Sequence, residues 1–463
     1  MAGSFSSLNT ALTALRYTSA AMDVASNNIA NVNTEGYTRR RVLAASIGAP
    51  AVPANWSIYD GVGGGVATNG VDRLSDALLD ARSRTEHGNQ SYLDVRSTVL
   101  QRVETAIGEP GDTGVSKALA DFRAAWHDLA NDPGGSASRT NVLGAATALA
   151  DAIHAQSRSL DSEASTQRAS LISAVSEVNT VATQLAQTNK TIAASQLDGV
   201  DVSNLQDQRD QLANRLAELT GGTATPRADG GLDVTVGGVS LVSGSTARSL
   251  VITGGTNPDG SADGNPVSLG ISDGTTTTAV SGLTGSVGST TDLLTTTLPA
   301  YAAGLSAVAK DLADGVNALH QGGFDSTGAA GGAFFTYDPT NVAGSLSVAI
   351  TDASKIAAAG TAGGTLDGSI ADSIGASGST ESAYQQLVTG FGTEVSSVKR
   401  QQTTQQMLTT QIDSARQQLS GVNLDEEMVS MLSSQRAYEA AARVMTTVDS
   451  VLDTLINRTG VTR

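Results

Sequence analysis

The chain has 463 residues, enough for about two to four domains, because single hydrophobic cores seldom grow beyond roughly 250 to 300 residues. Its 28 basic and 45 acidic side chains give a formal net charge of −17, which disfavours a phosphate backbone as a partner. Without cysteine it forms no disulfides or thiolate metal sites, and no apolar run approaches the roughly 18 residues that span a bilayer. We therefore expect neither nucleic acid nor a membrane among its partners.

Aromatic residues make up only 3% of the chain, so any core must be built mainly from leucine, valine, isoleucine and alanine. This composition suits long helices that meet along narrow seams, where a seam is a line of apolar residues on one helix face. The first predicted helix has such a seam, with apolar residues at intervals of three, four and seven. These residues are Leu8, Leu12, Leu15, Met22 and Ile29. The first residues have neither a basic leader nor an unbroken apolar stretch, so we expect no cleaved signal peptide.

The seam stops at an asparagine-rich turn. Asn31, Asn33 and Gly36 supply the turn chemistry, and three arginines follow at 39–41. The arginine cluster has three interpretations: it binds an anionic partner, it is a solvated charge run, or it pairs with acidic neighbours in an assembly.

Helical periodicity dominates the next part of the chain. A glycine-rich stretch at 51–71 predicts loop with a short strand. Apolar residues then recur every three or four positions over 91–107 and 115–129, on either side of a proline and glycine break. The stretch 138–219 has no proline, and 138–197 alone predicts a rod of about 90 Å at 1.5 Å per residue.

The composition changes at Gly221. From 222 to 298 the chain alternates valine and leucine with glycine, serine and threonine, which predicts a β-rich insert with tight turns. Helical character returns at 291–319, and a short strand is predicted at 345–350. A further helix is predicted over 381–421.

The last helix has the clearest seam. Asn423 is its predicted N-cap, and three acidic residues favour its positive first turn. Its apolar residues repeat by seven, and further members widen the face. They are Leu424, Met428, Met431, Tyr438, Met445, Leu452 and Leu455.

The sequence predicts no catalytic, cofactor or metal site. The four histidines, at 87, 127, 154 and 320, lie too far apart for metal-ligand spacing and are better explained as surface or packing residues. No phosphate-binding loop or nucleophile motif occurs, and the acidic turn at 257–265 lacks the spacing of a calcium loop. We therefore expect a protein that is not an enzyme and has no cofactor.

Residues 27–40, NNIANVNTEGYTRR, resemble the N-terminal signature of the axial proteins of the bacterial flagellum, the rod, hook and hook-associated subunits. Residues 420–458 are similar to the paired C-terminal segment of that family. The Tyr-Thr-Arg after Gly36 resembles the hook-associated subunits of the hook–filament junction more than hook protein, which typically has Phe-Lys. The matching N-terminal residues are Asn27, Asn28, Ile29, Ala30, Asn31, Asn33, Thr34, Gly36, Tyr37 and Arg39.

The resemblance, together with the helical and β-rich patterns above, predicts a mainly α fold with a β-rich insert, arranged as an elongated multi-domain rod. The terminal helices, within 1–45 and 405–463, would pair as an inner coiled-coil layer. Residues 46–221 and 291–404 would form a long helical bundle with strand-containing loops, and 222–290 an outer β domain.

By the same resemblance, the protein is a structural subunit of the adaptor ring between hook and filament. Its implied partners are further copies of itself, hook protein, the second junction protein (hook-associated protein 3) and a flagellar export chaperone. It would leave the cell through the type III export apparatus and belong to the extracellular flagellum. Hook protein itself, or an axial scaffold whose insert adheres to surfaces, are the alternatives.

The two terminal seams are the predicted assembly interface, because a helix with a single seam is marginal in water until it pairs. The predicted turn signature lets the chain leave the helical layer and packs at the crossing into the outer domain. It consists of Asn28, Asn31, Asn33, Gly36, Tyr37 and Arg39.

Overall fold

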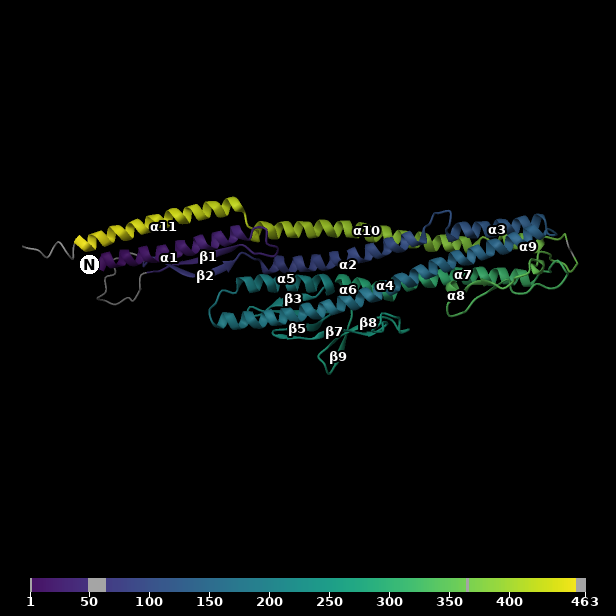
Figure 1. The fold of residues 1–463 in the computed structure, drawn as a ribbon, viewed down its shortest axis with the longest axis horizontal. Coiled ribbons are helices and arrows are strands. Elements are labelled where there is room, and N and C mark those ends of the chain that lie inside the picture. Colours follow the sequence, from purple (N-terminus) through teal and green to yellow (C-terminus); the bar gives the residue numbers. More distant parts are fainter. Residues whose placement is uncertain (1, 49–63, 364–365, 455–463) are drawn as a thin grey trace, which may run out of the picture.

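The computed structural model describes residues 2–48, 64–363 and 366–454, and it is an elongated rod of long helices (Figure 1). The first and last helices lie side by side at one end of the rod, and the strands of the insert lie along one side of the helical body. The predicted fold class, mainly α with a β-rich insert and paired terminal helices, is confirmed.

The paired terminal helices are α1 (Ala2–Ala30) and α11 (Leu424–Asp453). The predicted N-cap of α11 is confirmed, because the Asn423 side chain accepts hydrogen bonds from the backbone N–H groups of Asp425 and Glu426. The acidic side chains of this first turn also lie at the positive end of the helix dipole.

A two-stranded antiparallel ribbon follows α1. Its strands are β1 (Arg40–Ser46) and β2 (Val66–Arg73), and Arg40 lies opposite Arg73 in the register. The sequence predicted a strand within 51–71, whose first part lies outside the described residues, but it did not predict β1, because consecutive arginines obscure the alternation of a strand. We call α1, the ribbon and α11 the terminal arm.

Long helices form the rest of the rod, which we call the body. The helix predicted over 138–197 is confirmed as α4, and the chain then turns at Gly199, whose φ of +69° lies in the left-handed region. The long helices of the body are α2 (Ala77–Ile107), α3 (Val115–Asn131), α4 (Ser136–Leu197), α5 (Ser203–Thr220), α7 (Leu298–Gln321) and α10 (Ser379–Ser420).

Helix α2 begins at Ala77, well before the predicted start at 91. Asp76 caps it by accepting backbone hydrogen bonds from the first turn. The first half escaped the periodicity analysis because it packs through small and polar side chains. Gly88 lies so close to α5 that a Cβ there would be 2.8 Å from the Ala217 carbonyl oxygen.

The helix predicted over 291–319 is confirmed, but it contains a π-helical segment. The short helix α6 (Gly285–Asp292) runs into the π-helix η1 (Leu293–Thr297), which continues directly into α7. The whole region is therefore helical from Gly285 to Gln321.

The insert forms two antiparallel sheets that lie along α4 (Figure 1). Two asparagines of α4 hold them: Asn179 bonds both the N–H and the carbonyl of Leu250, and Asn189 does the same at Leu232. The first sheet contains β3 (Thr223–Pro226), β4 (Leu232–Val236), β5 (Val239–Ser243) and β6 (Thr246–Ala247). The second contains β7 (Ser249–Gly254), β8 (Ser268–Ser272) and β9 (Thr277–Val280).

Loops and short elements close the end of the body opposite the terminal arm, and we call residues 322–363 and 366–378 the distal cap. Although the chain has few aromatic residues, several lie together at this end. Trp126 of α3 packs against Phe334 with ring centroids 5.3 Å apart. The strand predicted at 345–350 is confirmed only as a short one. The elements of the cap are β10 (Phe335–Thr336), α8 (Val342–Ser345), β11 (Ser347–Val348), η2 (Ala353–Lys355) and α9 (Ser369–Ala376).

Candidate assembly interface

Four of the residues predicted for the seam of α1 occupy one of the two apolar positions of a heptad repeat, and small residues occupy the other. Its four large residues, spaced by seven, are only partly buried, whereas the three small residues between them are almost fully buried. The small residues were not predicted, because alanine and threonine give only a weak apolar signal, although they continue the alternating spacing of three and four. In chain order the seam is Leu8, Ala11, Leu15, Thr18, Met22, Ala25 and Ile29. Leu12, also predicted, lies beside this seam and is 38% exposed.

The seam of α11 that is turned inward contains part of the predicted set. Met431, Met445 and Leu452 are partly buried, and Tyr438 at the same spacing is 40% exposed. At the start of the helix the same line continues with Glu427, which is only 3% exposed. A carboxylate therefore occupies the position in the seam closest to the turn that follows α1.

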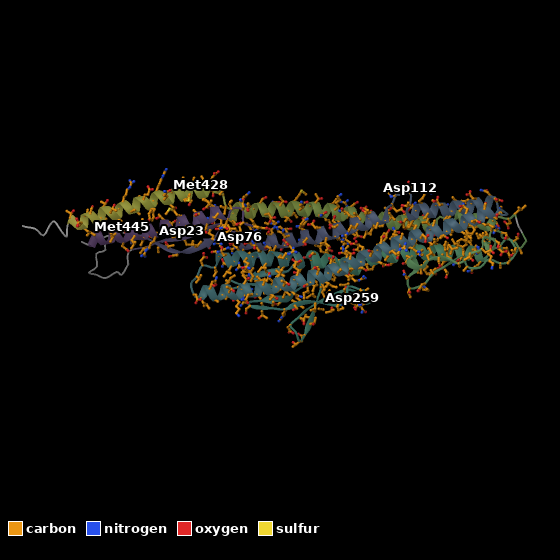
Figure 2. The ribbon with its side chains drawn as sticks, in the orientation of Figure 1. Asp23, Asp76, Asp112, Asp259, Met428 and Met445 are labelled. Carbon is orange, nitrogen blue, oxygen red and sulfur yellow. The ribbon has the colours of Figure 1, made fainter. Side chains whose placement is uncertain are left out.

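Other predicted residues of α11 lie on a second apolar face. Leu424 and Met428 are 44% and 50% exposed, and Val429 and Leu432 beside them are also exposed. Figure 2 labels Met428 near the start of α11 and Met445 near its end. Leu455 lies outside the described residues. A single chain thus leaves one apolar face of α11 uncovered.

Glu427 fixes the base of the arm through two side chains of the turn signature. Its Oε1 accepts from Arg39 Nε at 2.7 Å, and its Oε2 accepts from Asn28 Nδ2 at 3.0 Å. Arg39 also donates to the exposed Glu426 at 2.9 Å. From the sequence alone these acids are expected only to favour the helix dipole, because no local pattern reveals a contact across almost the whole chain.

Asn28 uses every hydrogen-bonding position of its amide and is 1% exposed. Besides Glu427, its Nδ2 donates to the Arg40 carbonyl at 2.9 Å. Its Oδ1 accepts from the Arg40 N–H at 3.1 Å and from the Tyr37 hydroxyl at 2.8 Å. An apolar residue at position 28 would leave these groups buried without partners.

The turn itself depends on local bonds and on one glycine. Asn31 Oδ1 accepts from the Thr34 hydroxyl at 3.1 Å, and Asn33 is exposed. Gly36 has φ +76°, and a Cβ there would lie 1.9 Å from Gln211 Nε2. An alanine at this position would therefore take a strained left-handed backbone and would displace the flexible, exposed Gln211 side chain.

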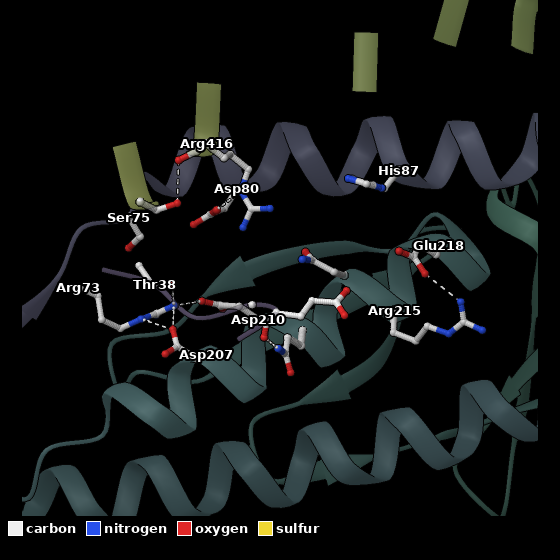
Figure 3. Close-up of a pocket in the computed structure, with 15 residues that line it drawn as sticks. Thr38, Arg73, Ser75, Asp80, His87, Asp207, Asp210, Arg215, Glu218 and Arg416 are labelled. Carbon is white, nitrogen blue, oxygen red and sulfur yellow. Dashed lines mark hydrogen bonds and ion pairs between the residues drawn. The ribbon is translucent and has the colours of Figure 1, made fainter. Parts of the chain in front are cut away.

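Two arginines at the base of the ribbon fasten the arm to the body, and we call this ion-pair cluster the joint. Arg40 pairs with Asp207 of α5 at 2.8 Å. Arg73 pairs with both Asp207 and Asp210 at 2.8 Å (Figure 3). These four side chains are at most 15% exposed. Burial acts to lower the pKa of Arg73, but the two carboxylates outweigh it and hold the pKa above its ordinary value.

The third interpretation of the arginine cluster was pairing with acidic neighbours in an assembly. Arg39 and Arg40 do pair with acidic side chains, but these belong to the same chain. Arg41 is exposed on β1. The Tyr37 ring lies 4.9 Å from the Arg40 guanidinium, and burial raises the pKa of the Tyr37 hydroxyl. The hydroxyl therefore stays protonated and continues to donate to Asn28 at neutral pH.

A cavity of about 460 Å³ lies beside the joint, between the turn, α2, α5 and the end of α10 (Figure 3). Several charged groups on its walls are paired: Arg416 with Asp80 at 2.8 Å, and Arg73 within the joint. His87, at another wall, lies 3.0 Å from Asp413.

Neither a metal-binding cluster nor a membrane-spanning helix occurs among the described residues. No group of three or more histidine, cysteine, aspartate or glutamate side chains is placed to hold a metal ion there. No helix of the described ranges is long and apolar enough to cross a membrane.

The N-terminal and C-terminal segments of the chain both match family models of known proteins. Residues 8–38 match the model for flagella basal body rod proteins, and residues 414–458 match the C-terminal model for the flagellar basal body rod FlgEFG proteins. The class they define is the structural proteins of the bacterial flagellum. Residues 100–335, about half of the chain, match the helical domain of the flagellar hook-associated protein FlgK, and the chain belongs to that family.

Whole proteins of similar sequence agree with this family. Flagellar hook-associated protein 1 of Bacillus subtilis is 29% identical over 100% of this chain and 99% of its own length. The protein of the same name from Escherichia coli is 25% identical over 97% of this chain and 99% of its own length. The structure of the flagellar hook junction protein FlgK from Burkholderia pseudomallei has a TM-score of 0.65 and 16% identity, over 74% of this chain and 100% of that one, and shows a shared fold.

Proposed function

We propose that this protein is a structural, non-enzymatic subunit of the flagellum that forms the junction between hook and filament. The observation that carries the proposal is the terminal arm: a heptad seam pairs α1 with α11, and a polar cluster centred on Asn28 and Glu427 fixes the base of the pair. The relatives named above as hook-associated protein 1, and the neighbour titled as a hook junction protein, support it.

The uncovered apolar face of α11 supports assembly with neighbouring subunits. Leu424, Met428, Val429 and Leu432 expose apolar surface that a further helix would cover. We propose as occupants further copies of this chain, hook protein on one side and the second junction protein, hook-associated protein 3, on the other.

The domain division proposed from the sequence follows from this role. Of the predicted terminal segments 1–45 and 405–463, α1 and α11 form the inner coiled-coil layer, although α10 continues through 405 to Ser420 and belongs to the body. The helical bundle predicted over 46–221 and 291–404 would lie outside this layer, and the insert at 222–290 would face outward. The two asparagines of α4 that hold the insert support a rigid outer layer rather than a loosely tethered one.

Export before assembly completes the proposal. An uncovered seam is an aggregation hazard, so a flagellar export chaperone is proposed to bind the C-terminal seam before secretion through the type III apparatus. A chain without disulfides and with half-buried terminal helices is compatible with passage in an unfolded state and folding outside the cell. The proposed location is the extracellular flagellum.

Electron microscopy of cells that lack the gene, with a blot of the medium for flagellin, tests the proposal. Bare hooks, with flagellin lost to the medium, are expected. Missing hooks would instead indicate hook protein or a rod component. Intact filaments would overturn the junction role, and cells that lose only surface attachment would support adhesion through the insert.

A further inference from the structure

Two buried side chains hold one peptide group of the distal cap from both sides. The carbonyl of Ile356 accepts a hydrogen bond from Arg139 of α4, and the N–H of the next residue, Ala357, donates to His320 Nε2 of α7 at 2.8 Å. Arg139 is 5% exposed and His320 is 0% exposed. The segment after η2 is thus fastened to two helices through a single amide unit.

The geometry fixes the protonation state of His320. Its Nδ1 lies 2.8 Å from the carbonyl oxygen of Gly332, which can only accept, so Nδ1 carries a proton. Nε2 faces the N–H of Ala357, which can only donate, so Nε2 must present a lone pair. Both bonds form only with the neutral imidazole protonated at Nδ1. A second proton would place two N–H donors against each other.

The surroundings of His320 also oppose a positive charge. Trp126 of α3 and Phe334 of the cap pack against the imidazole, with ring centroids at 6.4 and 5.4 Å. Burial lowers the pKa of His320, whereas the hydrogen bond to Gly332 acts to raise it. Two charged groups act on the ring: Arg139 lowers the pKa further and Asp325, after α7, opposes it, with a net shift below the ordinary value of 6.5.

We propose that His320 is a pH-sensitive latch: in its neutral form it holds residues 356–359 against the body, and its protonation releases them and opens the distal cap. The released segment would break the pairing of Phe324 with Ala359, whose backbone groups bond in both directions. The latch lies at the opposite end of the rod from the terminal arm (Figure 1), so the inference is independent of the proposed junction role.

The sign of the pH effect follows from the lowered pKa. The stabilisation is fully present above about pH 6.5, where the imidazole is neutral in both the closed and the open cap. Below that pH the His320 imidazole binds a proton in the open form but stays neutral in the closed form. The opening equilibrium constant should rise up to about tenfold for each further pH unit, until the pKa of the closed form is reached.

Hydrogen–deuterium exchange of the full-length protein tests this. Exchange of peptides that contain Ala357 is measured at pH 7.5, 6.5 and 5.5, and each rate is divided by the intrinsic rate at the same pH. In the wild type the corrected exchange should rise about tenfold between pH 7.5 and pH 5.5, of which about fivefold falls between pH 6.5 and pH 5.5. It should be pH-independent in His320→Gln, whose amide offers an NH2 donor group and a carbonyl acceptor. His87→Gln, beside the joint and far from the distal cap, should keep the wild-type slope.

Equal slopes in the wild type and His320→Gln would overturn the latch. Should His320→Gln fail to fold, nitrogen NMR of the wild-type histidine rings decides without a variant. A neutral ring protonated at Nδ1 at pH 7, with a pKa below 6.5, supports the latch. A proton on Nε2, or a ring that titrates at its ordinary value, contradicts it.

Discussion

The terminal arm and the body are held together by different kinds of contact. In the described part of the body, one continuous apolar cluster runs from α2 to α10 and includes both sheets of the insert, with side chains such as Leu149 and Leu185 at 0% exposure. No described residue of the arm belongs to this cluster. The arm instead relies on a seam whose large residues are half-exposed and on the buried polar groups around Glu427.

This difference indicates that a single chain stabilises the body by itself, whereas the arm needs contacts with neighbouring subunits. The body buries its apolar surface within one chain, whereas most of the exposed large apolar side chains lie on the arm or near it. An ion-paired joint gives the arm a specific orientation with little net stability, since the burial of charges offsets much of their attraction. We infer that the body folds first and that assembly completes the arm.

The largest expected effect comes from removing apolar volume from the body. Leu149→Ala should lower the free energy of unfolding by about 2 to 5 kcal/mol, because it loses buried methyl groups and leaves a cavity. Val429→Ala, on the uncovered face of α11, should change it by no more than about 0.5 kcal/mol yet reduce incorporation into the flagellum. Urea unfolding followed by circular dichroism measures the first effect. Equal destabilisation by both variants would mean that the contrast between arm and body is wrong.

Glu427→Ala should weaken the arm alone. It leaves the buried Asn28 amide and the Arg39 guanidinium without their acceptor, at a cost of about 1 to 3 kcal/mol of local stability. Hydrogen exchange should accelerate in α1 and α11 and stay unchanged in α4. Glu426→Ala is the matched control, because that carboxylate is 60% exposed and should contribute less than about 1 kcal/mol. Identical exchange in the two variants would show that Glu427 stabilises the arm no more than the exposed Glu426 does.

The sequence predicted the long elements and the turn well but not the contacts that join them. Helix α4, the β-rich insert and the Asn423 cap follow from periodicity and local chemistry, which act over a few residues. The pairing of Glu427 with Asn28 and of Arg73 with Asp207 joins residues far apart in the chain, and no local pattern encodes it. The predicted assembly interface stays a prediction, because the contacts proposed for its outer face are with other molecules.

Gly36→Ala should impair incorporation without impairing secretion. The left-handed φ costs an alanine about 1 to 2 kcal/mol, and the new Cβ collides with Gln211. The double variant with Gln211→Ala removes the collision but keeps the backbone strain, so it should recover only part of the loss. The amount of protein in purified hook structures, compared with the amount in the medium, measures both. Complete recovery in the double variant would assign the whole effect to the collision.

Tyr37→Phe should have the smallest effect, about 0.5 to 1.5 kcal/mol in the arm, because it removes one hydrogen bond to Asn28 and keeps the ring beside Arg40. Burial raises the pKa of the hydroxyl, so its stabilisation is fully present below about pH 10 and is lost as the pH rises through the folded pKa. Arm exchange in the wild type should therefore accelerate above pH 10 more than in Tyr37→Phe. Tyr17→Phe is the control, since the hydroxyl of Tyr17 makes no hydrogen bond within the described residues. If Tyr17→Phe loosens the arm as much, the polar contact at Asn28 is not what distinguishes the arm from the apolar body.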